Sequence, residues 1–509
     1  MSRFAVPGAV LLALVVVFVV ALVTRPGPAK VTEQASQAAS VTSVTRSCPP
    51  TAPGTTAARI AAIAVPSQAA GSVASTAETT GTATFTSVSA APSATAKSPA
   101  SKAAASPKAT ASSKATTSSK ATAAQRTTLS RPGTAASLVA AGGGTAVAAT
   151  GEMAEGFEAE QADASGTGLV TCSHPGSDLW FVGAGQSDGA SQMWLYLMNT
   201  GTVTASADVT ILTDTGQQSG LGSAITVLPG QSVKENIAPL VSGSQALAVH
   251  VQANTGQVTA SVWEGAGSGG AWLPEAAAPA TTQVIPGLTV ASSAAKLFVV
   301  VPGATDAQLK VVAYTPAGAV PQFPGNLVDA SAGAATPITL NSLGASAAGL
   351  KLTSNVPIVA GVLVPGGSGI GSFTTGVAPV TEQGVVAGNP ATRGDSVGLL
   401  LTAPAAAARV NVSVVSADGT VTKPAGDQGV SVTAGHTLAL AVPRPSDSRT
   451  PFAIVVTPAS GSGPLYAVRV VTSGSGGLSA PVVSLLPVQS ALTSITLPPA
   501  KDSYQAVLP

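Results

Sequence analysis

The chain has 509 residues, of which 9% are charged, 3% aromatic and 45% hydrophobic. Soluble domains usually carry about 25% charged residues, so a charged coiled coil and a wholly disordered acidic or basic chain are excluded. Turn-forming residues, 54 glycines and 38 prolines, also exclude a long helical bundle. Only one apolar run is long enough to cross a bilayer, which excludes a multi-pass membrane protein.

The amino-terminal part contains that apolar run. Residues 4–24 have no charge and residues 9–23 are wholly apolar, and about 20 such residues can span a bilayer. A cleaved signal peptide is the alternative, but the sequence from Ala21 to Pro26 is a poor cleavage site. We therefore expect a cytoplasmic stub at 1–3, a transmembrane signal anchor at 4–24 and a linker at 25–45. The bulk of a single-pass cell-membrane protein then lies outside the cytoplasm.

Two cysteines, Cys48 and Cys172, support export. They do not have the spacing of metal ligands, and a pair outside the cytosol most simply forms a disulfide. Two unrelated buried thiols are the alternative.

Charge is distributed unevenly, because the first 150 residues hold 12 of the 23 Lys and Arg but 2 of the 22 Asp and Glu. Much of this excess lies in a tract rich in Ala, Ser, Thr and Pro, which cannot bury enough apolar surface to fold. We expect a disordered insertion at 96–132 that serves either as a solvated spacer or as a contact for an anionic polymer or lipid headgroups. The contact residues would be Lys97, Lys102, Lys108, Lys114, Lys120, Arg126 and Arg131.

Beyond Gly133 the chain is strand-like, and one pattern occurs three times: an alternating strand enters a turn that closes on glycine. The segments are 208–216, 309–318 and 410–419. A second strand follows each, at 225–227, 338–340 and 430–432, then a strand pair such as 349–353 and 358–364. Tandem units of about 100 residues with short β-branched runs predict immunoglobulin-like antiparallel β-sandwiches.

The fold class expected is therefore mainly β, with three tandem sandwich repeats after the transmembrane helix. The first unit spans 46–280 and includes the insertion, the second spans 281–385 and the third 386–509. A closed three-lobed arrangement of these units is an alternative to a linear one.

Motifs for chemistry are weak. Residues 185–189 match the G-x-S-x-G pattern, but they lie between two predicted strands and no helix follows, as a nucleophile elbow requires. His174, His250 and His436 are scattered and lack metal-ligand spacing. We expect no catalytic residues, no metal site and no cofactor. An enzyme acting on envelope sugars would need paired carboxylates brought together by the fold.

All four tryptophans, Trp180, Trp194, Trp263 and Trp272, fall in the first predicted unit. They can form a larger core there, with Trp180 near the disulfide, or present indole faces to sugar rings. Trp272, in a glycine-rich loop, and Trp180 are the candidate glycan contacts.

Several blocks together resemble a known family: residues 151–161 with the sequence Gly-Glu-Met-Ala-Glu-Gly-Phe-Glu-Ala-Glu-Gln, then Cys172, then residues 175–185 with Trp-Phe-Val-Gly-Ala-Gly. The chain is similar over about 46–509 to actinobacterial membrane-anchored proteins classed as a domain of unknown function. Such genes often lie near a glycosyltransferase. The resemblance implies an envelope or polysaccharide context and supplies no catalytic residues.

These observations predict a non-enzymatic, membrane-anchored scaffold or adhesion protein of the cell envelope, and a carbohydrate-binding module is the alternative. The expected partners are the membrane, cell-wall polysaccharide or a membrane protein of envelope assembly, and not nucleic acid.

Overall fold

The structure is a computed structural model. It describes residues 16, 18–20, 33–34, 37–55, 57–65, 81–91, 126–140, 142–163, 168–188, 190–219, 221, 224–266, 269–289, 295–341, 343, 347–365, 370–392, 394–426, 428–445, 450–474, 482–497 and 500–501. The chain divides into two compact units. One comprises Val41–Thr493, and the other comprises Met1–Ser40 with Ser494–Pro509.

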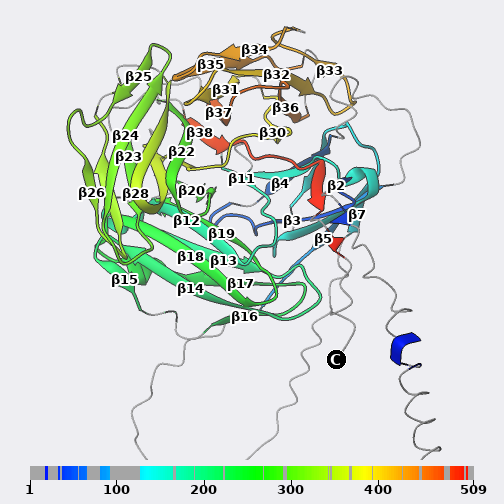
Figure 1. The fold of residues 1–509 in the computed structure, drawn as a ribbon, viewed down its shortest axis with the longest axis horizontal. Helices are drawn as coiled ribbons and strands as arrows, with labels where there is room; N and C mark the ends of the chain where they lie inside the picture. Colours follow the sequence, from blue (N-terminus) through cyan, green and yellow to red (C-terminus); the bar gives the residue numbers. More distant parts are fainter. Residues whose placement is uncertain are drawn as a thin grey trace, which may run out of the picture. The chain divides into compact units, whose positions relative to one another are not determined.

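The unit Val41–Thr493 is built from antiparallel sheets, as expected, and one strand order occurs four times in it (Figure 1). Seven consecutive core strands, named a to g here, form each lobe. Strands a, e and c lie side by side in that order in sheet A, and strands d, b, f and g do so in sheet B.

In lobe 1 the positions a to g are taken by β3 (Ser43–Cys48), β4 (Ala58–Ala64), β5 (Thr82–Ser87), β8 (Ala136–Val139), β9 (Thr145–Thr150), β10 (Phe157–Asp163) and β11 (Leu169–Thr171), with β7 (Arg126–Leu129) beside β5. In lobe 2 they are taken by β12 (Asp178–Ala184), β13 (Gln192–Met198), β14 (Ala205–Thr213), β17 (Gln231–Asn236), β18 (Ala246–Thr255), β19 (Thr259–Ala266) and β20 (Gly269–Leu273). Its edges carry β15 (Gly216–Gln218), β16 (Ile225–Val227) and β21 (Glu275–Ala276).

In lobe 3 the positions are taken by β22 (Ala280–Thr289), β23 (Lys296–Val300), β24 (Ala307–Thr315), β27 (Ala335–Thr339), the two halves of β28 (Ala347–Val364) and β29 (Ser372–Thr375), with β25 (Gly318–Pro321) and β26 (Val328–Ala330) beside β24. In lobe 4 they are taken by β30 (Gly384–Asn389), β31 (Asp395–Ala403), β32 (Ala408–Val415), β35 (His436–Val442), β36 (Phe452–Pro458), β37 (Tyr466–Ser473) and β38 (Val482–Pro487), with β33 (Val421–Thr422) and β34 (Val430–Val432) beside β32. Among the described residues, the short 3₁₀ helices η2 (Gly151–Met153), η3 (Gln186–Asp188) and η4 (Ala238–Val241) lie in connections.

Two expectations about the repeats differ from these sheets. Residues 46–280, expected to form one sandwich, hold both lobe 1 and lobe 2. The strand order is also not that of an immunoglobulin domain, where strands A, B, E and D share one sheet. Here successive strands from a to f alternate between sheet A and sheet B, and only f and g follow each other in the same sheet.

Local assignments in lobe 3 and lobe 1 also differ from expectation. The predicted strand pair 349–353 and 358–364 is one strand, β28, whose halves belong to different sheets. The counterpart of β16 and β34 is β26, not the segment at 338–340, because β26 pairs with the c strand. Residues 126–129, predicted to belong to the disordered insertion, form β7 and pair with β5.

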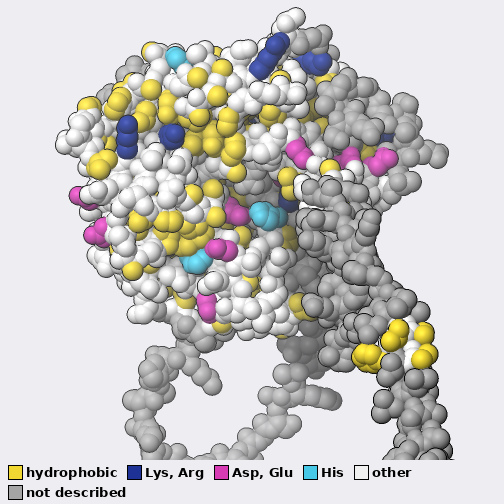
Figure 2. Space-filling view, viewed as in Figure 1, with side chains coloured by type: hydrophobic (Ala, Val, Ile, Leu, Met, Phe, Trp, Pro, Cys, Tyr) yellow, Lys and Arg dark blue, Asp and Glu magenta, His cyan; other side chains and the backbone are white. Residues whose placement is uncertain are grey.

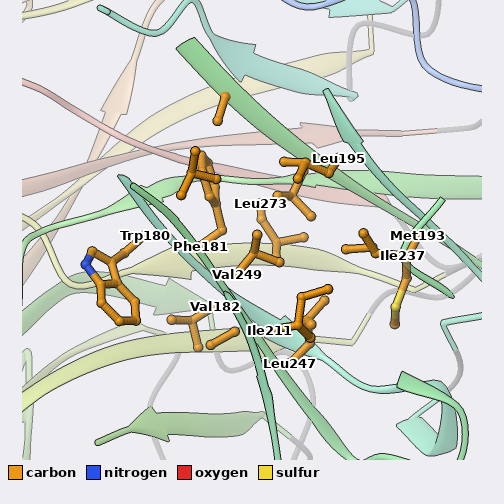
Figure 3. Packing of buried hydrophobic residues seen from close by; sticks show 14 of the residues in the cluster. Trp180, Phe181, Val182, Met193, Leu195, Ile211, Ile237, Leu247, Val249 and Leu273 are labelled. Carbon is orange, nitrogen blue, oxygen red and sulfur yellow. The ribbon is translucent and has the colours of Figure 1, made fainter. Parts of the chain in front are cut away.

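Neighbouring lobes pack sheet on sheet, so their cores are continuous. Figure 3 shows the core of lobe 2, where Phe181, Leu195 and Val249 meet from different strands. Phe298 of lobe 3 joins this core, and Leu400 of lobe 4 joins that of lobe 3. Because both faces of β23 are covered, its side chains from 297 to 300 are all buried, as its unbroken apolar run predicts.

Lobe 4 packs in turn on lobe 1, which closes the series of contacts. Ile63 of β4 and Val385 of β30 share one apolar cluster between the two lobes. Lobe 1 meets lobe 2 through β6 (Ser89–Ala90), which pairs with β17 in parallel. The four g strands, β11, β20, β29 and β38, contact one another in turn.

The other unit contains two strand pairs among its described residues: β1 (Glu33–Gln34) with β40 (Ala500–Lys501), and β2 (Gln37–Ser40) with β39 (Ser494–Leu497). The expected anchor at 4–24 lies largely outside the described residues; Val16 and residues 18–20 are helical. Within the part of the chain that the structure describes, no helix has the length and apolarity needed to cross a membrane.

Candidate functional site

A cavity of about 310 Å³ lies where the hairpins between strands f and g of all four lobes meet. Its walls therefore come from segments far apart in the sequence. They include Asp163 and Leu169 of lobe 1, Trp263 and Trp272 of lobe 2, Ile370 of lobe 3 and Leu485 of lobe 4.

Aromatic side chains form one wall of this cavity. Trp194, Trp263 and Trp272 are direct cross-strand neighbours on β13, β19 and β20, so they occupy one face of sheet B. Tyr196 lies beside them, with its ring centroid 5.6 Å from that of Trp272. The Lys234 ammonium lies 3.8 Å from the Trp194 ring centroid, a cation–π contact at the end of the row. We call Trp194, Trp263 and Trp272 the tryptophan row.

Two glycines make room for the middle ring of the row. A Cβ atom at Gly265 or at Gly270 would lie 2.1 Å from the Trp263 indole. Any larger residue would therefore push this ring off the sheet. Gly265 and Gly270 thus have a packing role here.

The disulfide holds two other walls of the cavity. Cys48 ends β3 and precedes residues 52–55, which line the cavity, while Cys172 directly follows β11, which supplies Leu169. The two cysteines are bonded, with their Cα atoms 4.2 Å apart, as the sequence predicts. Ala52 packs in one cluster with Trp263 and Trp272. The disulfide therefore fixes the loop at residues 52–55 against the tryptophan row.

The cavity has little charge, because Asp163 is the only ionisable residue among its described lining residues. Figure 2 shows that charged side chains are also sparse on the face of the molecule in view. Ser372 and Ser484 add hydroxyl groups to the lining. The arrangement offers apolar ring faces with a few hydrogen-bonding groups, which is the usual character of a small-molecule pocket.

Behind the tryptophan row lies a buried carboxyl group. Glu264 is 0% exposed. Its Oε2 accepts the Ala184 N–H at 3.3 Å, and its Oε1 has no hydrogen-bond partner among the described atoms. Burial raises the pKa of Glu264 well above its ordinary value, and the backbone donor opposes this only in part. Burial likewise raises the pKa of Glu275 to about 7, against the opposing charge of Arg46.

The raised pKa of Glu264 predicts that the protein loses stability as pH increases. The folded state keeps a proton on Glu264 that the unfolded chain releases near pH 4.5. The stabilisation from this proton is therefore fully present below pH 4.5 and decreases as the pH rises from there to the pKa of Glu264 in the folded state. One such proton changes the unfolding free energy by about 1.4 kcal/mol per pH unit. We expect a lower urea midpoint at pH 8 than at pH 5, and a smaller difference in Glu264→Gln.

Asp329→Asn, at an exposed position of β26, is the control and should leave the pH dependence unchanged. Equal slopes in wild type and Glu264→Gln would show that the Glu264 pKa is not raised by folding.

Of the predicted glycan contacts, Trp272 lines the cavity and Trp180 does not. Trp180 lies in sheet A of lobe 2 and stacks on His250, with ring centroids 3.9 Å apart, and His250 bonds Asp178 at 2.8 Å. It belongs to the lobe 2 core, whereas the disulfide belongs to the separate core of lobe 1. Trp272 and Trp180 are 6% and 5% exposed, so both are largely packed side chains.

Trp263 and Asp163 were missed by sequence reasoning. A signal was present, because the segments between strands f and g are rich in Gly and Ser in all four lobes. Only the fold shows that these segments occupy equivalent positions.

The predicted polyanion contacts fall into two groups. Lys97, Lys102, Lys108, Lys114 and Lys120 lie outside the described residues. Arg126, at the start of β7, and Arg131 are exposed on lobe 1. Among the described residues, no group of three or more His, Cys, Asp or Glu side chains could hold a metal ion.

Fold and site together define a mainly β protein whose antiparallel sheets surround an aromatic cavity. The family model "Family of unknown function (DUF5719)" matches residues 126–443, more than half of the chain, and the chain belongs to this family. The matched range starts at β7 and ends just after β35, so it contains the tryptophan row and is shorter than the expected 46–509. No curated protein matches the chain.

Proposed function

We propose that this protein is a non-enzymatic component of the cell envelope that binds a neutral glycan in the aromatic cavity, with the four lobes as a rigid scaffold around it. The observation that carries the proposal is that Trp263 and Trp272 both line one cavity. Indole faces pack well against the apolar faces of sugar rings, and Asp163 can accept hydrogen bonds from sugar hydroxyls.

The size and charge of the cavity favour this class of ligand. Pockets for small molecules usually enclose about 300–1,000 Å³, and this cavity encloses about 310 Å³. No Lys or Arg lies among its described lining residues, so it lacks a cation to pair with an acidic sugar or a phosphate. A neutral saccharide leaves no buried charge without a partner.

The disulfide and the apolar run at 4–24 support a location outside the cytoplasm, anchored to the cell membrane. Disulfides persist in oxidising compartments and are rare in the cytosol. This location would bring the cavity to cell-wall or exported polysaccharide. The scaffold role rests on the closed series of lobe contacts, which fixes the cavity walls relative to one another.

Two neighbouring carboxylates of β10, those of Glu158 and Glu160, have structural partners in this fold. Glu158 bonds Arg46 at 2.6 Å. Glu160 accepts hydrogen bonds from Arg469 and from the backbone N–H groups of residues 387 and 388. These carboxylates are occupied by structural contacts, which favours binding over catalysis.

Replacing Trp272 with alanine should reduce glycan binding at least tenfold, because it removes a ring from the cavity wall. Full-length protein purified in detergent would be sedimented with insoluble amylose, cellulose, mannan and chitin. Trp180→Ala is the matched control, since it removes an equally buried indole that stacks on His250 away from the cavity. The proposal is wrong if wild type binds none of these polymers, or if both variants bind as wild type does.

A salt series in the same experiment tests the basic tract at 97–131. Contacts between Lys or Arg and a polyanion are screened by salt, whereas ring stacking is not. Binding that disappears at high salt and on deletion of residues 96–125 would assign the contact to the tract rather than to the cavity.

A further inference from the structure

A second and larger cavity shares a lining residue with the first. It encloses about 570 Å³ and lies between sheet B of lobe 1 and the connection that follows β30 of lobe 4. Its wall includes Arg59, Ser137 and Asp163 of lobe 1 and Asn389 and Thr392 of lobe 4.

Asp163 is common to the walls of the two cavities. It is the last residue of β10, and it lines both the aromatic cavity and the cavity between lobes 1 and 4. The two cavities therefore approach each other at the end of this strand, on either side of one side chain.

The two cavities differ in character. The first has a wall of indole rings, whereas the second has polar groups and no aromatic residue among its described lining residues. The Ser137 hydroxyl is buried in the wall of the second cavity and has no hydrogen-bond partner among the described atoms. Buried hydroxyls are nearly always paired, but this one has almost no accessible surface, so the groups open to the cavity are those of exposed residues such as Thr392. The exposed Arg59 adds a donor.

From this shared wall we infer that the ligand is a linear oligosaccharide, with one segment against Trp263 and Trp272 and the next segment past Asp163 in the second cavity. This inference rests on the proposed function. A chain of sugars suits the geometry because each unit repeats the same ring faces and hydroxyls, while the two cavities supply different contacts for successive units.

The test compares short and long ligands by isothermal titration calorimetry on the full-length protein in detergent. The probes are maltose and maltohexaose, cellobiose and cellohexaose, and mannobiose and mannohexaose. We expect one hexasaccharide to bind at least tenfold more tightly than its disaccharide. Thr392→Trp places a large side chain at an exposed position of the second cavity, and should weaken the hexasaccharide to the affinity of the disaccharide without changing the latter.

Thr422→Trp, at an exposed position of β33 outside both cavities, is the matched control and should bind like wild type. Equal affinities for short and long chains, or no effect of Thr392→Trp, would overturn the inference while leaving the proposed function standing. If wild type binds no probe, the proposed function fails and the inference fails with it.

Discussion

Arg469→Met should lower the unfolding free energy by about 3–5 kcal/mol, the range seen when one partner of a buried ion pair is removed. The Arg469 guanidinium is 0% exposed and its Nη1 lies 3.0 Å from Glu160 Oε2 and 2.8 Å from the Gly388 carbonyl oxygen. The variant leaves the Glu160 carboxylate buried without its cation, at the contact where lobe 4 closes on lobe 1. Urea unfolding followed by circular dichroism measures the loss.

A second substitution distinguishes the stability lost with the ion pair from the stability lost with the volume of the Arg469 side chain. Glu160→Gln in the Arg469→Met background removes the uncompensated charge and should recover a large part of the lost stability. Arg409→Met is the control, because Arg409 is exposed and bonds only the Gln428 carbonyl oxygen among the side-chain contacts described; it should change stability by less than about 0.5 kcal/mol. Equal losses for Arg469→Met and Arg409→Met would contradict the argument.

Removing the disulfide should have an effect of similar size. The bond closes a loop with a sequence separation of 124, and the chain-entropy model then predicts a loss of about 4–5 kcal/mol for the variant with Cys48→Ala and Cys172→Ala. Most of this effect arises in the unfolded chain, which gains freedom when the link is absent. The urea midpoint of the double variant measures it.

Reduction of the wild-type protein with dithiothreitol should reproduce the midpoint of the double variant. An unchanged midpoint in both would exclude a stabilising role for the bond. The same link fixes residues 52–55 over the tryptophan row. The double variant should therefore also bind glycan more weakly than wild type, measured without urea under conditions where both proteins are folded.

The repeated strand pattern was predictable because local chemistry specifies it. The three predicted turns close on Gly216, Gly318 and Gly419, and all three have positive φ, between 88° and 120°. Glycine adopts this conformation at little cost, so each turn can be recognised in the sequence by a glycine at its end. The strands before these turns are β14, β24 and β32, the c strands of lobes 2, 3 and 4.

The sequence pattern did not reveal lobe 1 as a repeat because lobe 1 lacks the tight glycine turn after its c strand. Its c strand, β5, is followed by β6 and the basic tract rather than by a tight turn, and the next strand along the chain that pairs with β5 is β7. A long excursion in place of the turn removes the glycine and the spacing on which recognition of the repeat depended. The sequence pattern therefore indicated three units, and the sheets contain four.

The candidate site was predictable only in part. Trp272 was identified from its aromatic side chain in a glycine-rich loop, but its neighbours depend on register. Trp194, Trp263 and Trp272 come together because β13, β19 and β20 align them across sheet B, and a shift of one residue would turn Trp263 to the other face.

By itself, the sequence determined the mainly β class, the alternating strands, the turn glycines and the pairing of its two cysteines, since each depends on neighbouring residues or on a single possible partner. Only the tertiary structure decided that four lobes close on one another, that the f–g hairpins meet at one cavity, and that Asp163 also lines a second. Contacts between lobes depend on the shapes of whole sheet faces, such as the one where Ile63 meets Val385, and such surfaces leave no periodic signal along the chain.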